Sequence, residues 1–257
     1  MANSVSLGRH PFLHVDIRRV SMLQALVWIR QGWDDLRHNR AASLAHGALI
    51  TALGAVLLVL GSSHPYLVAA AISGYLLVGP IMTTGLCELS RRRAAGEPTG
   101  FDESLSGITR NAQGLFYFGA VLAVLAAAWF VVSGLVLQSS LHTQPPTLGE
   151  ALWGSVSDVI SGPEILAYVG SGAILAAIVF ALSVVAVPLI IDRHASALEA
   201  MWISIKVTFW NLPAMIVWAA LIVILTMIGF APFLFGMILI APLLGHATWH
   251  AYRDLVV

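Results

Sequence analysis

The strongest constraint on this chain is that all of its Lys and Arg residues fall on one side of its hydrophobic segments. Hydropathy marks six apolar runs, near Leu44–Gly61, Pro65–Leu86, Gly114–Leu137, Ile165–Ile191, Leu212–Ile228 and Phe230–Trp249. When the runs cross a bilayer in turn, the 13 cations lie before the first run, in the second and fourth connections, and after the sixth. Because short cytoplasmic loops retain positive charge, the pattern predicts six spans with both termini in the cytoplasm.

Composition supports a membrane protein of the multi-pass class. The chain is 58% hydrophobic and 10% charged, whereas a soluble domain carries roughly 25% charged residues. The segment before the first run is too long and too polar for a cleaved signal peptide. No basic tract is dense enough to indicate nucleic-acid binding. The single cysteine, Cys87, excludes an intrachain disulfide.

Three cytoplasmic segments, which precede the first, third and fifth runs, each carry an apolar stripe at helical spacing. The stripes are Met22, Leu26, Ile29, Trp33 and Leu36; Phe101, Leu105, Ile108 and Ala112; and Leu198, Trp202, Ile205 and Phe209. Thr99 with Asp102, and Ser196 with Glu199, have the spacing of capping boxes. We expect three amphipathic helices that lie in the membrane interface or pack across the cytoplasmic ends of the spans.

The same features recur three times along the chain. An asparagine closes each amphipathic segment, at Asn39, Asn111 and Asn211, and can form the turn into the span. The second span of each hairpin contains a proline that frees a backbone carbonyl and kinks the helix, namely Pro80, Pro188 and Pro242. The sequence therefore predicts an all-α fold of six transmembrane helices, built as three pseudo-repeated hairpins over about 20–90, 99–192 and 196–253.

Two other segments complete the predicted organisation. Residues 1–19 are expected to form a flexible cytoplasmic N-terminus, ahead of a single six-span membrane domain over 20–257. The connection 138–164 contains Pro145-Pro146, and Thr147 with Glu150 caps a short helix after it. We expect a periplasmic loop with one interfacial helix, which is the largest outer surface that the chain can offer to a partner.

Candidate chemistry gathers at the cytoplasmic ends of the spans. His46 lies within the first run, while His246 and His250 are four residues apart and share a helix face. Glu88 and Asp192 lie at the exits of the second and fourth runs. The three histidines could bind a transition metal or a haem, with Glu88 or Asp192 alongside. Alternatively, each imidazole reaches the interface or bonds a carbonyl freed by a proline.

The cations beside the amphipathic segments predict a second kind of site. They form a basic collar that can contact anionic lipid headgroups, or a partner protein, at up to about 1 kcal/mol per residue. The residues that we assign to this contact are Arg30, Arg37, Arg40, Arg91, Arg92 and Arg93.

Several motifs, in order, resemble a family of bacterial predicted integral membrane proteins catalogued as domain of unknown function 2189. They are Gly32-Trp33-Asp34-Asp35-Leu36, His64-Pro65-Tyr66, Leu77-Val78-Gly79-Pro80, Glu88-Leu89-Ser90-Arg91 and Leu244–Arg253. The resemblance covers roughly residues 20–255 and implies a six-span protein of the bacterial inner membrane, with no established activity. Such proteins sometimes carry a label that refers to cytochrome c oxidase subunit I. That subunit resembles a twelve-span bundle rich in buried histidine ligands, whereas only His46 lies clearly within a run here.

These observations support three functional hypotheses. The leading one is a non-enzymatic scaffold or accessory subunit of a membrane complex, for which a respiratory oxidase is one candidate partner by association alone. It needs no cofactor, and we found no enzyme motif such as G-x-x-x-x-G-K-[ST], H-E-x-x-H or G-x-S-x-G. The second is a small transporter, channel or lipid-handling protein. The third is a metal- or haem-binding redox protein that uses His46, His246 and His250.

Overall fold

A computed structural model describes residues 15–61, 75, 79–140, 162–232 and 234–257. In these ranges the regular structure is helical, which confirms the all-α class. The helices are α1 (Gln24–His38), α2 (Arg40–Gly61), α4 (Thr84–Ala94), α5 (Phe101–Arg110), α6 (Ala112–Ser140), α8 (Gly162–Ser183), α9 (Ala186–Asp192), α10 (Ala197–Trp210), α11 (Leu212–Phe230) and α12 (Met237–Leu255).

Four segments of the described chain are long and apolar enough to cross a membrane. They are Arg40–Val59, Ala112–Ser133, Leu166–Asp192 and Leu212–Phe230, and they coincide with the predicted first, third, fourth and fifth spans. Most of the predicted second span, Pro65–Leu86, lies outside the described residues. The predicted sixth span, Phe230–Trp249, overlaps α12 only over 237–249, because α11 continues to Phe230 and α12 begins at Met237. α12 does not join the four because its second half carries polar residues.

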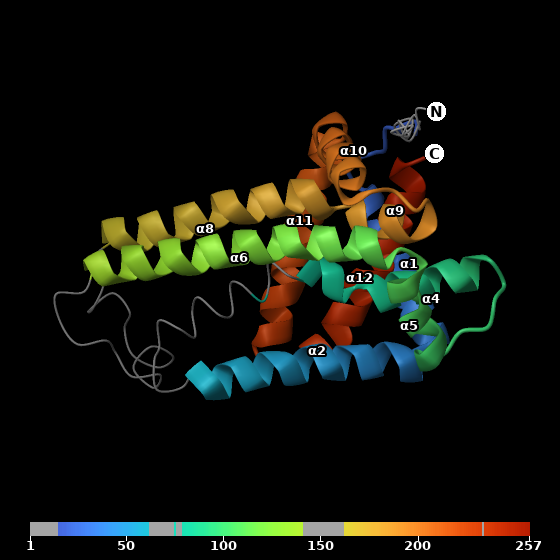
Figure 1. Ribbon diagram of the computed structural model, residues 1–257, viewed down its shortest axis with the longest axis horizontal. Coiled ribbons are helices and arrows are strands. Elements are labelled where there is room, and N and C mark those ends of the chain that lie inside the picture. Colours follow the sequence, from blue (N-terminus) through green and yellow to red (C-terminus); the bar gives the residue numbers. More distant parts are fainter. Residues whose placement is uncertain (1–14, 62–74, 76–78, 141–161, 233) are drawn as a thin grey trace, which may run out of the picture.

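The long helices extend away from an end at which the short ones gather. Figure 1 shows α6 and α8 running side by side, with α2 on the opposite side of the molecule. Between α6 and α8, Trp129 and Tyr168 pack with their ring centroids 5.3 Å apart. The helices α1, α4, α5, α9 and α10 lie near the ends of the chain (Figure 1). α12 contacts α1, α2, α4, α9 and α11, and 12 of its 19 residues are buried.

The three predicted asparagine turns are confirmed. Asn39, Asn111 and Asn211 each end one helix, and the next helix begins at the following residue. The Asn111 side-chain amide donates to the carbonyl of Ala195 at 2.9 Å. The Asn211 side chain accepts from the backbone N–H of Val20 at 2.9 Å. Two of the joints are therefore tied to segments distant in sequence, while the threefold repeat as a whole stays a prediction.

The prolines have different effects on their helices. Pro188 has no N–H to donate to the carbonyl of Val184, and the helix is interrupted at residues 184–185, between α8 and α9. Thr83 interrupts the helix just after Pro80, and its hydroxyl donates to the Pro80 carbonyl at 2.7 Å. Pro242 lies inside α12 without ending it.

Two glycines bring neighbouring helices against the backbone of α12. Pro242 leaves the carbonyl of Ile238 without its usual helical donor, and Gly47 of α2 packs directly on that carbonyl. A Cβ at Gly47 would overlap the Ile238 oxygen, and one at Gly32 of α1 would lie 2.7 Å from the backbone nitrogen of Ala247. Small residues permit close helix approach of this kind within membranes.

The three amphipathic helices form as predicted, but most residues of their apolar stripes face outward; Leu36 of α1 is an exception and is buried. In α1, Leu26 and Trp33 are exposed, and in α5, Leu105 and Ile108 are exposed. The buried face of α5 carries Ser104 and Gly107, and that of α1 carries Ala25, Trp28, Gly32 and Asp35, together with Leu36 from the predicted stripe. In α10 the predicted stripe is also largely exposed, while a second apolar face packs inward. Outward apolar and aromatic side chains suit helices at a membrane interface.

The structure bears on two predicted capping boxes, on the predicted N-terminal segment and on the predicted loop helix. The capping box of Ser196 and Glu199 is confirmed, whereas the Thr99–Asp102 box is wrong because Gly100 is the N-cap and no side chain caps α5. Of the N-terminal segment predicted over 1–19, residues 15–19 are described, and there Ile17 pairs with Val256; the flexibility of the segment stays a prediction. The loop helix predicted within 138–164 lies outside the described residues, apart from the ends of α6 and α8.

Replacing Gly47 by Ala is expected to lower the free energy of unfolding by about 1–3 kcal/mol, because the new methyl group forces α2 away from the Ile238 carbonyl. Gly170→Ala in α8 is the matched control, since a Cβ there meets nothing within 4 Å. Thermal unfolding in detergent, followed by circular dichroism, measures both. Equal melting temperatures for the two variants would contradict this packing.

Candidate functional site

The polar second half of α12 forms the centre of the candidate site. His246 is fully buried, at 0% exposure. Its Nε2 lies 2.8 Å from the Ser43 hydroxyl of α2, and its Nδ1 lies 2.7 Å from the Ser90 hydroxyl of α4. A neutral imidazole offers one donor and one acceptor, and hydroxyl groups can take either role. Both contacts can therefore be hydrogen bonds at once, so that His246 links three helices.

His250, one turn further along α12, meets a buried carboxylate of α1. The Asp35 side chain accepts from His250 Nε2 at 2.9 Å and from Arg93 Nη1 at 2.6 Å. Burial alone raises the pKa of Asp35, but hydrogen bonds with His250 and Ser90, and then the attraction of His250, outweigh it. The pKa of Asp35 therefore lies below its ordinary value, and the charged form is stabilised in the folded protein.

Two further residues near the end of α12 continue this pattern. The Asp254 carboxylate accepts from Gln24 Nε2 and from Trp28 Nε1, both at 2.8 Å. The Tyr252 hydroxyl donates to Asp192, the last residue of α9, at 2.6 Å. We call His246, His250, Tyr252 and Asp254, with their partners, the α12 network.

Glu88 of α4 belongs to a separate charged cluster. Its carboxylate is fully buried and receives two bonds from Arg91, at 2.8 and 2.9 Å, and one from Arg92 at 3.0 Å. Arg110 of α5 lies 3.8 Å away, and Glu97 pairs with Arg91 at 2.7 Å. A buried carboxylate is costly unless it is paired and hydrogen-bonded, so this cluster holds the turn between α4 and α5 together.

The structure separates residues that the sequence grouped. Glu88 binds arginines, while Asp192 binds Tyr252, so these two acids do not form one site. Arg91 is 9% exposed and held by two glutamates. Arg91 is therefore not free for the headgroup contact that we predicted. Arg92 and Arg93 are also ion-paired, whereas the other three predicted headgroup contacts, Arg30, Arg37 and Arg40, are exposed.

The three candidate metal ligands have three different environments. His46 Nε2 lies 2.7 Å from the Ser104 hydroxyl of α5, and its ring packs against Phe101. His246 contacts α2 and α4, and His250 contacts α1. Within the described part of the chain, no group of three or more His, Cys, Asp or Glu side chains is arranged to hold a metal ion. A metal or haem at these histidines stays a prediction.

The partners of the α12 network were not predicted from the sequence. Asp35 stands on the same helical face as Ala25, Trp28 and Gly32, with spacings of three, four and three residues. This second stripe, which mixes small, aromatic and acidic residues, is the signal that marks the buried face. Ser43 and Ser90 carried no comparable signal, because a serine in an apolar or basic stretch has no preferred partner in sequence.

About half of the chain matches the model of a known protein family. Residues 67–192 match the DUF2189 family model, which is described as a predicted integral membrane protein. The match confirms the resemblance found in the motifs at Leu77–Pro80 and Glu88–Arg91. The chain is thus an integral membrane protein with several apolar helices. No curated protein and no solved structure matches it.

His246→Leu is expected to lower the free energy of unfolding by about 3 kcal/mol, because two buried hydroxyls lose their partner. Adding Ser43→Ala and Ser90→Ala to that variant is expected to recover part of the loss, since removing all partners leaves no unsatisfied group. Chemical unfolding in mixed detergent micelles measures the cycle. Strictly additive losses would show that these groups do not interact.

The lowered pKa of Asp35 predicts a pH dependence of stability. Its stabilising effect is fully present above the ordinary aspartate pKa of about 3.9 and is lost as the pH falls through the lower pKa of the folded state. Asp35→Asn should therefore melt well below the wild type at pH 6, and the gap should narrow below pH 4. A gap that stays constant over this range would contradict the assignment.

Proposed function

We propose that this protein is a non-enzymatic scaffold or accessory subunit of a complex in the bacterial inner membrane. The observation that carries the proposal is the α12 network. Each of its polar side chains forms a hydrogen bond with another helix, so that hydrogen bonds hold the short helices together at the end of the spans. The outward faces of α1 and α5 are then available for contacts outside the chain.

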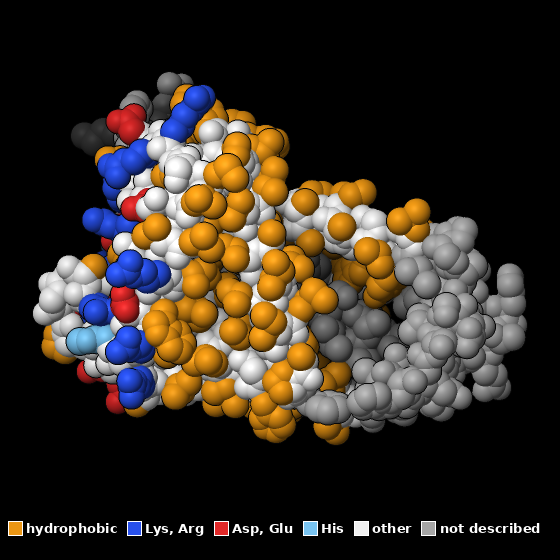
Figure 2. Space-filling model, turned by 180° about the vertical axis from the view of Figure 1, so that it is seen from behind, with side chains coloured by type: hydrophobic (Ala, Val, Ile, Leu, Met, Phe, Trp, Pro, Cys, Tyr) orange, Lys and Arg blue, Asp and Glu red, His pale blue; other side chains and the backbone are white. Residues whose placement is uncertain are grey.

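The distribution of charge supports an orientation with both termini in the cytoplasm. Figure 2 shows the Lys and Arg side chains gathered at one end of the face in view, beside a broad field of hydrophobic side chains. Ile17 pairs with Val256, and the C-terminus lies in the short-helix region (Figure 1). Short positively charged segments stay on the cytoplasmic side, so we assign this end to the cytoplasm.

The finer architecture that we propose is a six-span bundle of three related hairpins. The recurring helix–asparagine–helix joint supports it, as do the helix breaks near Pro80 and Pro188. In this arrangement α12 is the sixth span, buried among its neighbours rather than exposed to lipid. Its apolar first half lies in the membrane, and its polar second half lies at the cytoplasmic end.

The outward stripes are the proposed contact surfaces. Leu26 of α1 is 50% exposed, and Ile108 of α5 is 53% exposed. Side chains of this kind contact either the lipid interface or a partner's apolar surface. A scaffold uses part of this surface for a partner membrane protein, for which a respiratory oxidase is one candidate, while exposed Arg30, Arg37 and Arg40 contact anionic headgroups.

Site-specific photo-crosslinking in native membranes tests the proposal. A photoreactive phenylalanine at Leu26 or at Ile108 should give discrete protein adducts of one size. The same residue at Ile174 of α8, which is also exposed, is the matched control and should give lipid adducts only. Adducts with lipid alone at all three positions would contradict the scaffold function.

The alternative of a lipid-handling protein is favoured by one observation, a groove lined by residues 15–17 and by helix α10. The redox alternative has its own test. Purified wild type and a His246/His250 double variant are compared for bound metal and for a Soret band. A metal or haem that is present in the wild type and lost in the variant would replace the scaffold proposal.

A further inference from the structure

Helix α10 lies at one boundary of the membrane, because it connects two candidate spans. The span over Leu166–Asp192 ends just before α10, and the span over Leu212–Phe230 begins just after it. Consecutive spans cross a bilayer in opposite directions, so the two ends that α10 connects lie at the same boundary. The connection carries Arg193 and Lys206, which assigns it to the cytoplasmic side in the proposed orientation.

One face of α10 is exposed and mainly aromatic. Trp202 and Trp210 are 53% and 58% exposed, and Phe209 is also exposed. Lys206, the one cation in the sequence of α10, is exposed on the same face, one turn from each tryptophan. Tryptophan beside Lys or Arg is the usual combination at a membrane–water interface, where indole rings lie near the headgroups. This face of α10 therefore meets lipid at the level of the phosphates.

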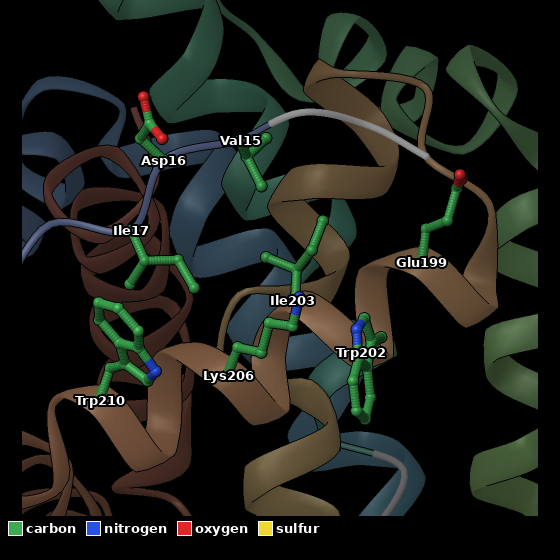
Figure 3. Close-up of a pocket in the computed structure, with 8 residues that line it drawn as sticks. All are labelled: Val15, Asp16, Ile17, Glu199, Trp202, Ile203, Lys206 and Trp210. Atoms are coloured by element: carbon green, nitrogen blue, oxygen red, sulfur yellow. The ribbon is translucent and has the colours of Figure 1, made fainter. Parts of the chain in front are cut away.

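A groove of about 820 Å³ lies beside this face, between α10 and residues 15–17. Figure 3 shows Lys206 between the two indoles and Ile17 pointing toward α10, where it forms an apolar floor with Ile203. The 15–17 segment is held in place because Ile17 pairs with Val256. The groove thus combines one ammonium group, two aromatic surfaces and an apolar floor.

Lys206 is available to bind an anion. Its Nζ lies 5.3 Å from the Trp202 ring centroid, and the ion pairs of the described residues do not include it. The cation–π contact orients the ammonium group without neutralising its charge. The aliphatic stem of a lysine can lie along apolar surface while its charged end reaches the phosphate level.

The two acids of the groove lining are directed elsewhere. Figure 3 shows the Asp16 carboxylate directed away from α10 and Glu199 at the opposite end of the groove. Glu199 Oε2 accepts from the backbone N–H of Ser196 at 3.1 Å and from its hydroxyl at 2.8 Å, so this carboxylate is held in the helix cap. Glu199 and Lys206 are two helical turns apart, about 10 Å along the axis. An anion at Lys206 therefore has no carboxylate directly opposite it in the described lining.

A second cation is fixed beside the other tryptophan. The Arg19 guanidinium carbon lies 5.5 Å from the Trp210 ring centroid. The residues on both sides of Arg19 bind Asn211, which directly follows α10: the Val20 N–H donates to Asn211 Oδ1 at 2.9 Å, and Asn211 Nδ2 donates to the Arg18 carbonyl at 3.1 Å. Each exposed indole of α10 thus carries a cation, and the two cations come from different parts of the chain.

We propose that this face of α10 binds one anionic phospholipid of the phosphatidylglycerol type. The phosphodiester lies at Lys206, and the glycerol region lies against the indoles, above the apolar floor of the groove. Arg19 adds positive charge at the Trp210 end of the site. This assignment is independent of the scaffold function, since it uses α10 and not the outward stripes of α1 and α5. It is one defined site, unlike the headgroup contacts proposed for Arg30, Arg37 and Arg40.

Charge explains why zwitterionic phospholipids fit less well. Phosphatidylethanolamine and phosphatidylcholine carry the same phosphodiester, but each adds a cationic group to a face that already carries Lys206 and Arg19. The acids of the lining are directed away from Lys206, so they do not compensate that group. The phosphatidylglycerol headgroup adds hydroxyls instead of a charge, and its net charge is opposite to that of the two cations.

Native mass spectrometry of the full-length protein in detergent tests the proposal. The protein is titrated with phosphatidylglycerol, phosphatidylethanolamine and phosphatidylcholine of identical acyl chains, and the dissociation constant of the first bound lipid is measured. Lys206→Gln removes the charge of the site, and Lys206→Arg is the matched control that keeps it. Arg30→Gln removes an exposed cation of α1 and measures the effect of overall charge. Circular dichroism verifies that each variant is folded.

We expect the wild type to bind phosphatidylglycerol about fivefold more tightly than either zwitterionic lipid, the effect of about one cation at a membrane surface. Lys206→Gln should weaken phosphatidylglycerol binding about fivefold, whereas Lys206→Arg should stay within about twofold of the wild type. Equal binding of the three lipids by the wild type would overturn the proposal. Equal losses in Lys206→Gln and Arg30→Gln would also overturn it, because charge would then act without a defined site.

Discussion

The burial of a polar helix end is the constraint on which the rest of this structure depends. The second half of α12 carries His246 into the interior and places His250 and Asp254 in partly buried positions, and an unpaired polar group in the interior costs several kcal/mol. Each is satisfied by a side chain from another helix, including Ser43, Ser90 and Asp35. The short helices are thus fixed around α12 by hydrogen bonds, because apolar contact alone gives little net driving force among helices that are surrounded by lipid.

The features that were predictable from the sequence are those that depend on a water–membrane boundary. One-sided Lys and Arg fixed the expected topology, and four of the six runs are found as candidate spans in the described residues. The joints at Asn39, Asn111 and Asn211 were predictable because helix ends have local chemical requirements. The Ser196 cap was predicted for the same reason, while Thr99 failed because Gly100 takes the N-cap position.

The direction of the amphipathic helices was not predictable, because an apolar stripe can face a protein core or lipid equally well. Leu26 and Ile108 face outward, and the inner face of α1 is marked instead by Gly32 and Asp35. The grouping of histidines failed for a related reason. Residues at one depth, such as His46 and His246, can point to different neighbours, and sequence spacing does not encode which helix stands beside which.

The most direct test of the account is hydrogen–deuterium exchange of the full-length protein in lipid nanodiscs, resolved to peptides. If the α12 network holds the short helices together, peptides over residues 243–252 are predicted to exchange more slowly than those of α10, and His246→Leu is predicted to speed exchange in α1, α4 and α12 together. Exchange over 243–252 as fast as in α10, or an effect of His246→Leu confined to α12, would contradict the central role of this helix.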